Sequence, residues 1–179
     1  MFNLSGVYPE ITQNVTVSDI IFSGGNHSSQ LTVKNEATLT ISKNLTINNN
    51  GKLLLNGGTL QYDGNGNPGQ NISMASTGTS IEIINSGIFN SPKGKLTVNG
   101  ELILNNGTIN LGNGFELAWG KFFKVTEGSI NIYGQTNIYG IIDGGIGNFI
   151  FNGNSGNSDH KVTITGGGRF YMAPTSSEN

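Results

Sequence analysis

Short runs of alternating apolar and polar residues follow one another along this chain, separated by corners of asparagine and glycine. The runs are about five residues long and begin every six to nine residues, for example at 37–41, 44–47 and 52–55. Alternation with a period of two is the pattern of a β-strand that buries one face. Strands this short are poor hairpin partners, whereas a winding chain can pair each coil with the next. The rhythm therefore predicts a solenoid built from strands.

One internal repeat indicates the length of a coil. Residues 50–60 align without gaps on residues 99–109. Equivalent strand starts also recur at a constant interval, at Ile81, Leu102 and Phe123, with three strands in each interval. We expect an all-β, three-sided parallel β-solenoid with coils of about 21 residues. The offset between the two copies of the repeat then spans two coils and an insertion.

Two stretches rich in asparagine and glycine delay the next strand. They are residues 63–71 and 152–160, and we expect both to form protruding loops. A chain of 179 residues has the length of one domain, and no window of it has helical periodicity. We divide that domain into first coils at 1–36, a regular solenoid at 37–111, an aromatic-rich continuation at 112–165 and a C-terminal end at 166–179.

The composition excludes several classes of protein. Glycine (28) and asparagine (26) supply nearly a third of the chain, which is too much turn former for a helical protein, while the periodic apolar residues argue against disorder. The net charge is −2 and the nine cationic residues are scattered, so we expect no nucleic-acid binding. The absence of cysteine excludes disulfides and thiolate sites. We also expect no secretory signal at the start and no membrane-spanning segment.

The coil pattern resembles that of parallel β-helix (β-solenoid) proteins. The similarity rests on the periodicity and on the phrases at 50–60 and 99–109, covers about residues 37–151, and is strongest to asparagine- and glycine-rich bacterial surface adhesins and phage fibres. It implies a β-solenoid fold and an extracellular or surface-exposed place, in a cell-surface filament or a virion. It also implies one of several functions, since that group includes adhesins, appendages, filaments and polysaccharide-cleaving enzymes.

The acidic residues do not form a catalytic pattern. Glycoside cleavage in most families needs two carboxylates roughly 5–10 Å apart, yet successive acids in the last two thirds of the chain lie at least eleven residues apart. Stacking of coils could bring Glu101 near Glu82 or Glu127. Asp159 and His160 are the only adjacent acid and histidine, but adjacent side chains normally point apart, so we interpret the pair as part of a solvated loop. We therefore expect no catalytic residues, no cofactor and no enzyme activity.

One segment has part of the pattern of a calcium loop. Asp63, Asn65 and Asn67 place oxygen ligands at alternating positions. The pattern then fails, because Pro68 stands where such loops need glycine and Met74 stands where they carry a bidentate glutamate. An asparagine- and glycine-rich turn explains the same residues, so we expect no metal site and keep these three as its candidates.

Ten of the fifteen aromatic residues lie between Phe115 and Tyr171. They are interpreted as the filling of a wider core, as a subunit interface, where aromatic residues are favoured, or as a platform for stacking sugars. We favour the interface over the sugar platform because no cluster of acids and amides accompanies the rings in sequence. The interface candidates are Trp119, Phe122, Phe123, Tyr133, Tyr139, Phe170 and Tyr171.

The leading functional hypothesis is a non-catalytic structural subunit that self-assembles through its open ends or its sides into an extracellular fibre, filament or virion appendage, with adhesion as one use. No capping repeat is recognisable, charge is sparse, and stacked asparagines can add ladder hydrogen bonds between coils. The expected partners are further copies of the chain and a cell-surface glycan. The alternative is a tailspike-like β-helix that binds or cleaves glycans.

Overall fold

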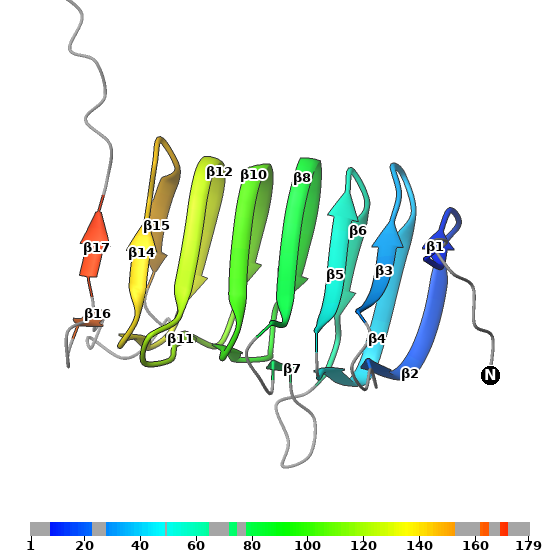
Figure 1. Cartoon of the computed structure of the whole chain (residues 1–179), viewed down its shortest axis with the longest axis horizontal. Helices are drawn as coiled ribbons and strands as arrows, with labels where there is room; N and C mark the ends of the chain where they lie inside the picture. The colour runs from blue at the N-terminus through cyan, green and yellow to red at the C-terminus, as the bar shows by residue number, and fades with distance from the viewer. Residues whose placement is uncertain are drawn as a thin grey trace, which may run out of the picture.

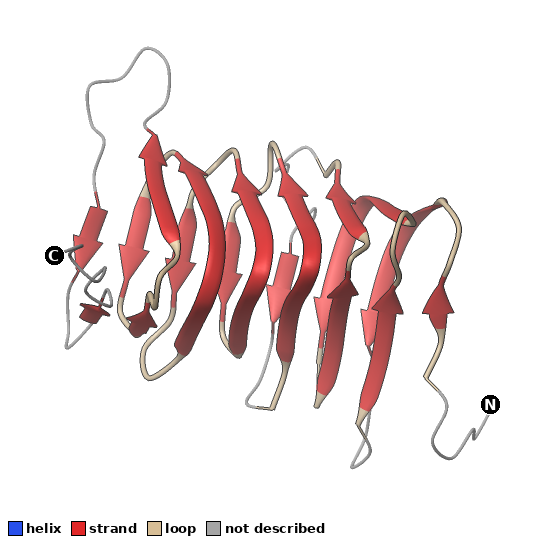
Figure 2. Ribbon diagram, turned by 90° about the horizontal axis from the view of Figure 1, so that it is seen from above, coloured by secondary structure: helices blue, strands red, loops and turns tan. Residues whose placement is uncertain are grey.

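The chain folds into a parallel β-solenoid of about six turns (Figure 1). A computed structural model describes residues 8–22, 28–48, 50–64, 72–74, 78–152, 162–164 and 169–171. These residues contain seventeen strands and no helix, and each strand pairs in parallel with strands of the neighbouring turns. The first strand (Glu10–Ile11) and the last strand (Arg169–Tyr171) lie at opposite ends of the solenoid (Figures 1 and 2). The expected all-β solenoid fold is confirmed, while its three-sided cross-section stays a prediction.

The pairings follow three ladders, each of which takes one strand segment from successive turns. The first ladder contains β1 (Glu10–Ile11), β3 (Ser29–Val33), β5 (Gly51–Asn56), the first halves of β8 (Ser80–Ser91), β10 (Glu101–Leu111) and β12 (Phe122–Tyr133), then β14 (Ile141–Asp143) and β17 (Arg169–Tyr171). The second contains the first parts of β2 (Val15–Phe22) and β4 (Thr38–Ile47), β6 (Thr59–Tyr62), the second halves of β8, β10 and β12, and β15 (Asn148–Asn152). The third contains the second parts of β2 and β4, then β7 (Ile72–Met74), β9 (Leu96–Val98), β11 (Phe115–Leu117), β13 (Thr136–Ile138) and β16 (Val162–Ile164).

The register confirms the predicted coil length. Ile81 pairs with Leu102 and Leu102 pairs with Phe123, so these two turns are equally long and match the expected coil of about 21 residues. Leu53 pairs with Ile81, which makes the preceding turn longer than these two. The offset between the two copies of the sequence repeat is therefore two turns, the first of which carries an insertion.

Both predicted insertions fall where the register requires them. Leu60 and Ile72 are aligned with Leu39 and Leu45 of the preceding turn. The chain between Leu60 and Ile72 is six residues longer than the chain between those two partners. Between Phe151 and Val162 it is seven residues longer than between the corresponding residues of the preceding turn. The inserted residues 65–71 and 153–161 themselves lie outside the described residues.

The core is the stack of inward side chains from all three ladders. In β10, Leu102 and Leu104 are buried while Ile103 between them is half-buried on the outer side, and the same alternation recurs in most strands. Burying each such side chain contributes about 1.5–3 kcal/mol. Thirty buried apolar residues form one continuous cluster from Phe22 to Ile142, so the solenoid has a single core within its described part.

The corner between the first and second ladders needs left-handed backbone. Gly57 and Asn106, which are equivalent in the sequence repeat, have φ angles of 72° and 59°. Glycine and asparagine adopt this conformation more readily than other residues. The next residue is also constrained, because a Cβ on Gly107 would lie 2.6 Å from Cγ2 of Ile83. This explains why asparagine and glycine occupy the corners.

Candidate functional site

The outward side chains of the first ladder form a surface that we call the first-ladder face. A groove of about 210 Å³ lies on it, across β10, β12 and β14. Its outer walls come from outward residues, and the buried Leu102 and Phe123 contribute to its floor. The lining residues are Glu101, Leu102, Ile103, Phe122, Phe123, Lys124 and Asp143.

Strand register places the groove side chains in a grid. Glu101 pairs with Phe122 of the next turn. Two residues further along the strands, at the next outward position, Lys124 lies between Ile103 of the preceding turn and Asp143 of the following turn. Neighbouring strands are about 4.8 Å apart, so side chains in one row of the grid are direct neighbours. Phe122 is 51% exposed as a residue, although phenylalanine is among the residues most often buried. The groove thus combines an exposed ring, two carboxylates and one ammonium group.

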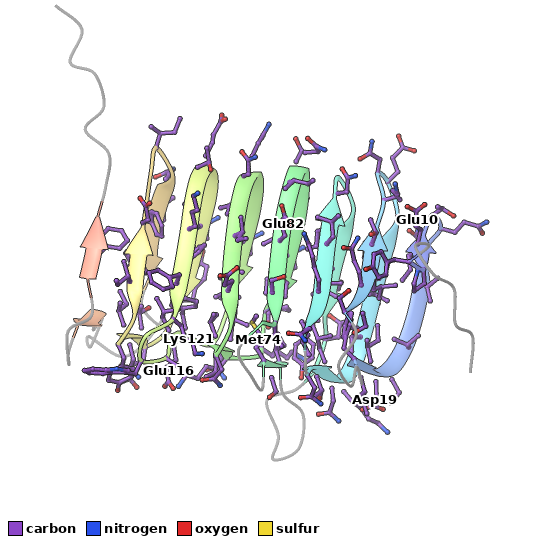
Figure 3. The ribbon with its side chains drawn as sticks, viewed as in Figure 1. Glu10, Asp19, Met74, Glu82, Glu116 and Lys121 are labelled. Atoms are coloured by element: carbon purple, nitrogen blue, oxygen red, sulfur yellow. The ribbon has the colours of Figure 1, made fainter. Side chains whose placement is uncertain are left out.

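The corner that leads into the groove is longer than its neighbours. Leu117 is aligned with Val98 of the preceding turn, and Phe122 with Glu101, so four residues fill this corner instead of two. Trp119 lies on the extended corner and is 70% exposed. Figure 3 labels Lys121, which belongs to the same corner. The extension displays the chain's single tryptophan next to the start of β12.

The carboxylates predicted to stack do not form a simple pair. Glu82 is aligned with Ile103, two positions along the strand from Glu101, and its carboxylate forms an ion pair with Lys52. Glu82 projects from the middle of the solenoid in Figure 3. Glu127 is aligned with Asn105, near the corner at the other end of the segment. The acid that lines the groove with Glu101 is instead Asp143.

The outward side chains of the second ladder form a contrasting surface, the second-ladder face. They lie in two rows that run along the solenoid, and no member of either row is charged. The hydroxyl row contains Thr38, Thr59, Ile88, Thr108, Ser129 and Asn148. The amide row contains Thr16, Thr40, Gln61, Asn90, Asn110, Asn131 and Ile150.

Part of the amide row is a hydrogen-bonded ladder. The side-chain nitrogen of Asn110 donates to Oδ1 of Asn90 at 2.7 Å, and that of Asn131 donates to Oδ1 of Asn110 at 2.8 Å. All three side chains are half-buried. The expected stacking of asparagines between coils therefore occurs within these strands, and it also occurs at a corner, where Nδ2 of Asn85 donates to Oδ1 of Asn56 at 2.7 Å. The coil period of 21 residues aligns Asn110 with Asn131, whereas Asn90 lies 20 residues before Asn110 and is aligned with it by a register shift in β10 that the period does not reveal.

The predicted interface residues divide into two groups. Trp119 and Phe122 are exposed, as is Tyr133, whereas Tyr139 is half-buried. Phe123 is buried and packs against Phe115 and Phe149 at ring-centroid distances of 5.8 and 5.9 Å. Its ring therefore belongs to the core and is not available to a neighbouring chain.

The last described turns are filled by aromatic rings, as the wider-core interpretation expects. Phe170 is half-buried and contacts Phe149 edge to face, with ring centroids 4.9 Å apart. Phe151 packs against both of these rings. Tyr171 belongs to β17, but its side chain lies outside the described part of the structure.

The two tyrosines in the repeated Asn-Ile-Tyr-Gly phrase flank β13. Tyr133 ends the second-ladder segment and Tyr139 follows the third-ladder segment, so they occupy successive corners of one turn. The outward residue between them is Asn137, whose Oδ1 accepts a hydrogen bond from Nε2 of Gln135 at 3.2 Å. In the turn before, Glu116 is aligned with Asn137 and forms an ion pair with Lys95 at 2.7 Å. The two amides lie between the tyrosines in the sequence, whereas Glu116 is brought next to Asn137 only by the register between turns.

The metal candidates receive no structural support as a group. Asp63 is exposed and accepts a hydrogen bond from Nε2 of Gln61 at 2.6 Å, while Asn65 and Asn67 lie outside the described residues. Among the residues that the structure describes, no three histidine or acidic side chains are grouped to hold an ion. Asp159 and His160 also lie outside this part of the chain.

Comparison with known proteins adds no relative. No protein-family model, curated protein or solved structure gives a significant match to this chain. In the part of the chain that the structure describes, no helix is long and apolar enough to span a membrane.

Proposed function

We propose that this chain is a non-catalytic structural β-solenoid that associates side by side with further copies of itself through the second-ladder face. The observation that carries the proposal is the absence of charge from both outward rows of that ladder, from Thr16 to Ile150. β-Proteins usually keep charged side chains on exposed strands, where they oppose association. Here the two rows offer a second copy hydroxyl and amide groups without an ionic barrier.

The hydrogen-bonded asparagines favour this mode of contact. Ordering side chains at an interface costs about 0.5–1.5 kcal/mol for each flexible group. The amides of Asn90, Asn110 and Asn131 are already held by one another in the free chain. A second solenoid has the same spacing of about 4.8 Å between strands, so rows on two copies can interdigitate in register, as in dry interfaces between paired sheets.

Exposed apolar residues on the first turn would need a second contact, outside the second-ladder face. Ile21 of β2 is 64% exposed and belongs to the third ladder, and Val15 of the same strand is 39% exposed although it is aligned with the buried Leu39. A contact of a neighbouring copy with this end of the solenoid would cover them. The biological setting that we propose is an extracellular fibre, filament or virion surface appendage, which such lateral association would build or reinforce.

The experiment compares one threonine on the second-ladder face with one on the third ladder. Thr108→Lys places a charge in the hydroxyl row, and Thr97→Lys places the same charge on a half-buried outward position of β9, the strand just before β10. Light scattering over a concentration series and negative-stain electron microscopy measure assembly. We expect wild type and Thr97→Lys to assemble and Thr108→Lys to stay monomeric.

The proposal has two clear ways to fail. A wild-type chain that stays monomeric at every concentration would contradict self-association. Equal assembly of the two lysine variants would contradict the second-ladder face as its site, provided that both melt cooperatively. Circular dichroism melting supplies that control.

A further inference from the structure

The groove on the first-ladder face has an apolar wall. The half-exposed phenyl group of Phe122 and the half-buried side chain of Ile103 supply this wall. The groove volume of about 210 Å³ is smaller than that of sites for drug-sized ligands, which begin near 300 Å³. The occupant is therefore one cyclic unit, free or within a chain that continues beyond the groove.

The charges of the groove discriminate between ligand classes. The two carboxylates of Glu101 and Asp143 outnumber the ammonium group of Lys124, which is aligned next to Asp143, so the groove repels an anion. A neutral ligand with many hydroxyl groups meets no such barrier. Its hydroxyls can donate to the two carboxylates and accept from the ammonium group, and hydrogen bonds to charged partners are stronger than neutral ones.

We propose that this groove binds one ring of a neutral oligosaccharide. The C–H face of the sugar stacks on Phe122, and its hydroxyl groups bond to Glu101, Lys124 and Asp143. Trp119, on the extended corner before β12, offers a second aromatic surface to the next ring. This inference does not depend on lateral association, because the groove and the uncharged rows belong to different ladders.

The geometry favours binding without cleavage. Glu101 and Asp143 belong to strands two turns apart and are offset by two residues along the strand. Lys124 stands on the strand between them, whereas glycosidases leave the gap between their two carboxyl groups open to the sugar and water.

The test is a nuclear magnetic resonance titration of the full chain with cellotetraose, maltotetraose and chitotetraose at millimolar concentrations. We expect at least one of them to shift the backbone amide signals of residues 101–103, 122–124 and 141–143. The fluorescence of Trp119, the single tryptophan, should change over the same concentration range. We expect tetragalacturonate, which is anionic, to produce no such change.

Matched variants locate the site. Phe122→Ala should weaken binding about tenfold, as expected for the loss of one stacking ring. Tyr133→Ala is the control, since Tyr133 is an exposed aromatic residue (46%) at the opposite end of the same strand, and it should bind as wild type does. Glu101→Gln should also weaken binding, whereas Glu127→Gln should not.

Three outcomes would overturn the proposal. They are no signal change with any of the three neutral sugars, changes confined to residues outside the groove, and equal binding of tetragalacturonate. The titration is repeated with Thr108→Lys to separate this proposal from the previous one. If Thr108→Lys is monomeric and still binds the sugar, the sugar site and the assembly face are supported independently. If the wild type binds the sugar but never assembles, only the proposal of lateral association is refuted.

Discussion

The first-ladder and second-ladder faces are built on the same strands, yet their outward side chains differ in kind. β10 runs through both ladders and presents Glu101 and Ile103 on the first, then Thr108 and Asn110 on the second. Its inward residues are apolar in both segments. The core of a solenoid therefore restricts the residue type only at every second position, and the outward positions can differ from one face to the other.

The two faces also differ in how much they repeat. On the second-ladder face one residue type recurs at equivalent positions, as in Asn90, Asn110 and Asn131. On the first-ladder face the corresponding row changes from Glu82 to Ile103 to Lys124. A repeated row suits a periodic partner such as a second solenoid, whereas a varied row suits a single local ligand. The proposed assembly surface and the proposed sugar site follow from that difference.

The largest expected effect comes from the core beneath the groove. Phe123→Ala should lower the free energy of unfolding by about 3–5 kcal/mol, because it empties a fully buried site that touches Phe115 and Phe149. Phe122→Ala, one residue earlier and outward, should cost less than about 1 kcal/mol. Urea unfolding followed by circular dichroism measures both. Similar losses for the two variants would show that the exposed ring of Phe122 is structural and would weaken the sugar proposal.

The next effect is at the corner that separates the two faces. Gly107→Ala should destabilise the fold by about 1–3 kcal/mol, because its Cβ would lie 2.6 Å from Cγ2 of Ile83 and 2.7 Å from the carbonyl oxygen of Gly87. Asn106→Gly is the control at the neighbouring position. Asn106 has a φ of 59°, where glycine is less strained, so this variant should unfold at an equal or higher urea concentration. Destabilisation by both changes would refute this account of the corner.

Sequence analysis could predict the fold because the core and the corners are periodic. Ile81, Leu102 and Phe123 recur at a constant interval, and the pleat of the strand then fixes which neighbours point inward. Gly57 and Asn106 marked a corner whose backbone few residues adopt. These are local requirements, so they are visible in one sequence.

The candidate site was less visible because it depends on register between turns. Glu101, Phe122 and Asp143 are widely separated in sequence, and only the ladder pairings bring them to one groove. The exposure of Trp119 depends on a corner two residues longer than its neighbours, which the coil period does not reveal. Phe123 was expected at an interface and lies in the core, since aromatic content alone does not distinguish inward from outward positions.

A smaller effect should come from breaking the amide ladder of the second-ladder face. Asn110→Ala removes one side-chain donor and one acceptor and leaves Asn90 and Asn131 each without their bond to it. We expect a loss of about 1–2 kcal/mol. Asn105→Ala, an exposed position on the same strand, should change stability by less than about 0.5 kcal/mol. If Asn110→Ala is equally neutral, the ladder does not order the face in advance of assembly.

Alkaline pH should lower the free energy of unfolding through Tyr62, a core residue of the second ladder. Tyr62 is buried there, its hydroxyl donates to the carbonyl oxygen of Lys43 at 2.5 Å, and burial, with a smaller contribution from Asp19, raises its pKa. The unfolded state then ionises first, so stability is complete below about pH 10 and falls above it, by at most about 1.4 kcal/mol per pH unit. Urea unfolding between pH 8 and 11 measures this loss. Tyr62→Phe should remove this dependence on pH; an unchanged dependence would assign it to other groups.

The smallest effect distinguishes the two faces by their response to salt. Lys52 and Glu82 form a partly exposed ion pair on the first-ladder face, and such pairs contribute about 0.2–1 kcal/mol. A double-mutant cycle with Lys52→Met and Glu82→Gln measures the coupling energy, which should fall as salt rises because the Debye length shortens from about 30 Å at 0.01 M to 3 Å at 1 M. The loss in Asn110→Ala should not change with salt, since that ladder contains only neutral amides. A salt-dependent Asn110→Ala effect would mean that charges outside the two rows act on the second-ladder face, and its description as an uncharged surface would then be wrong.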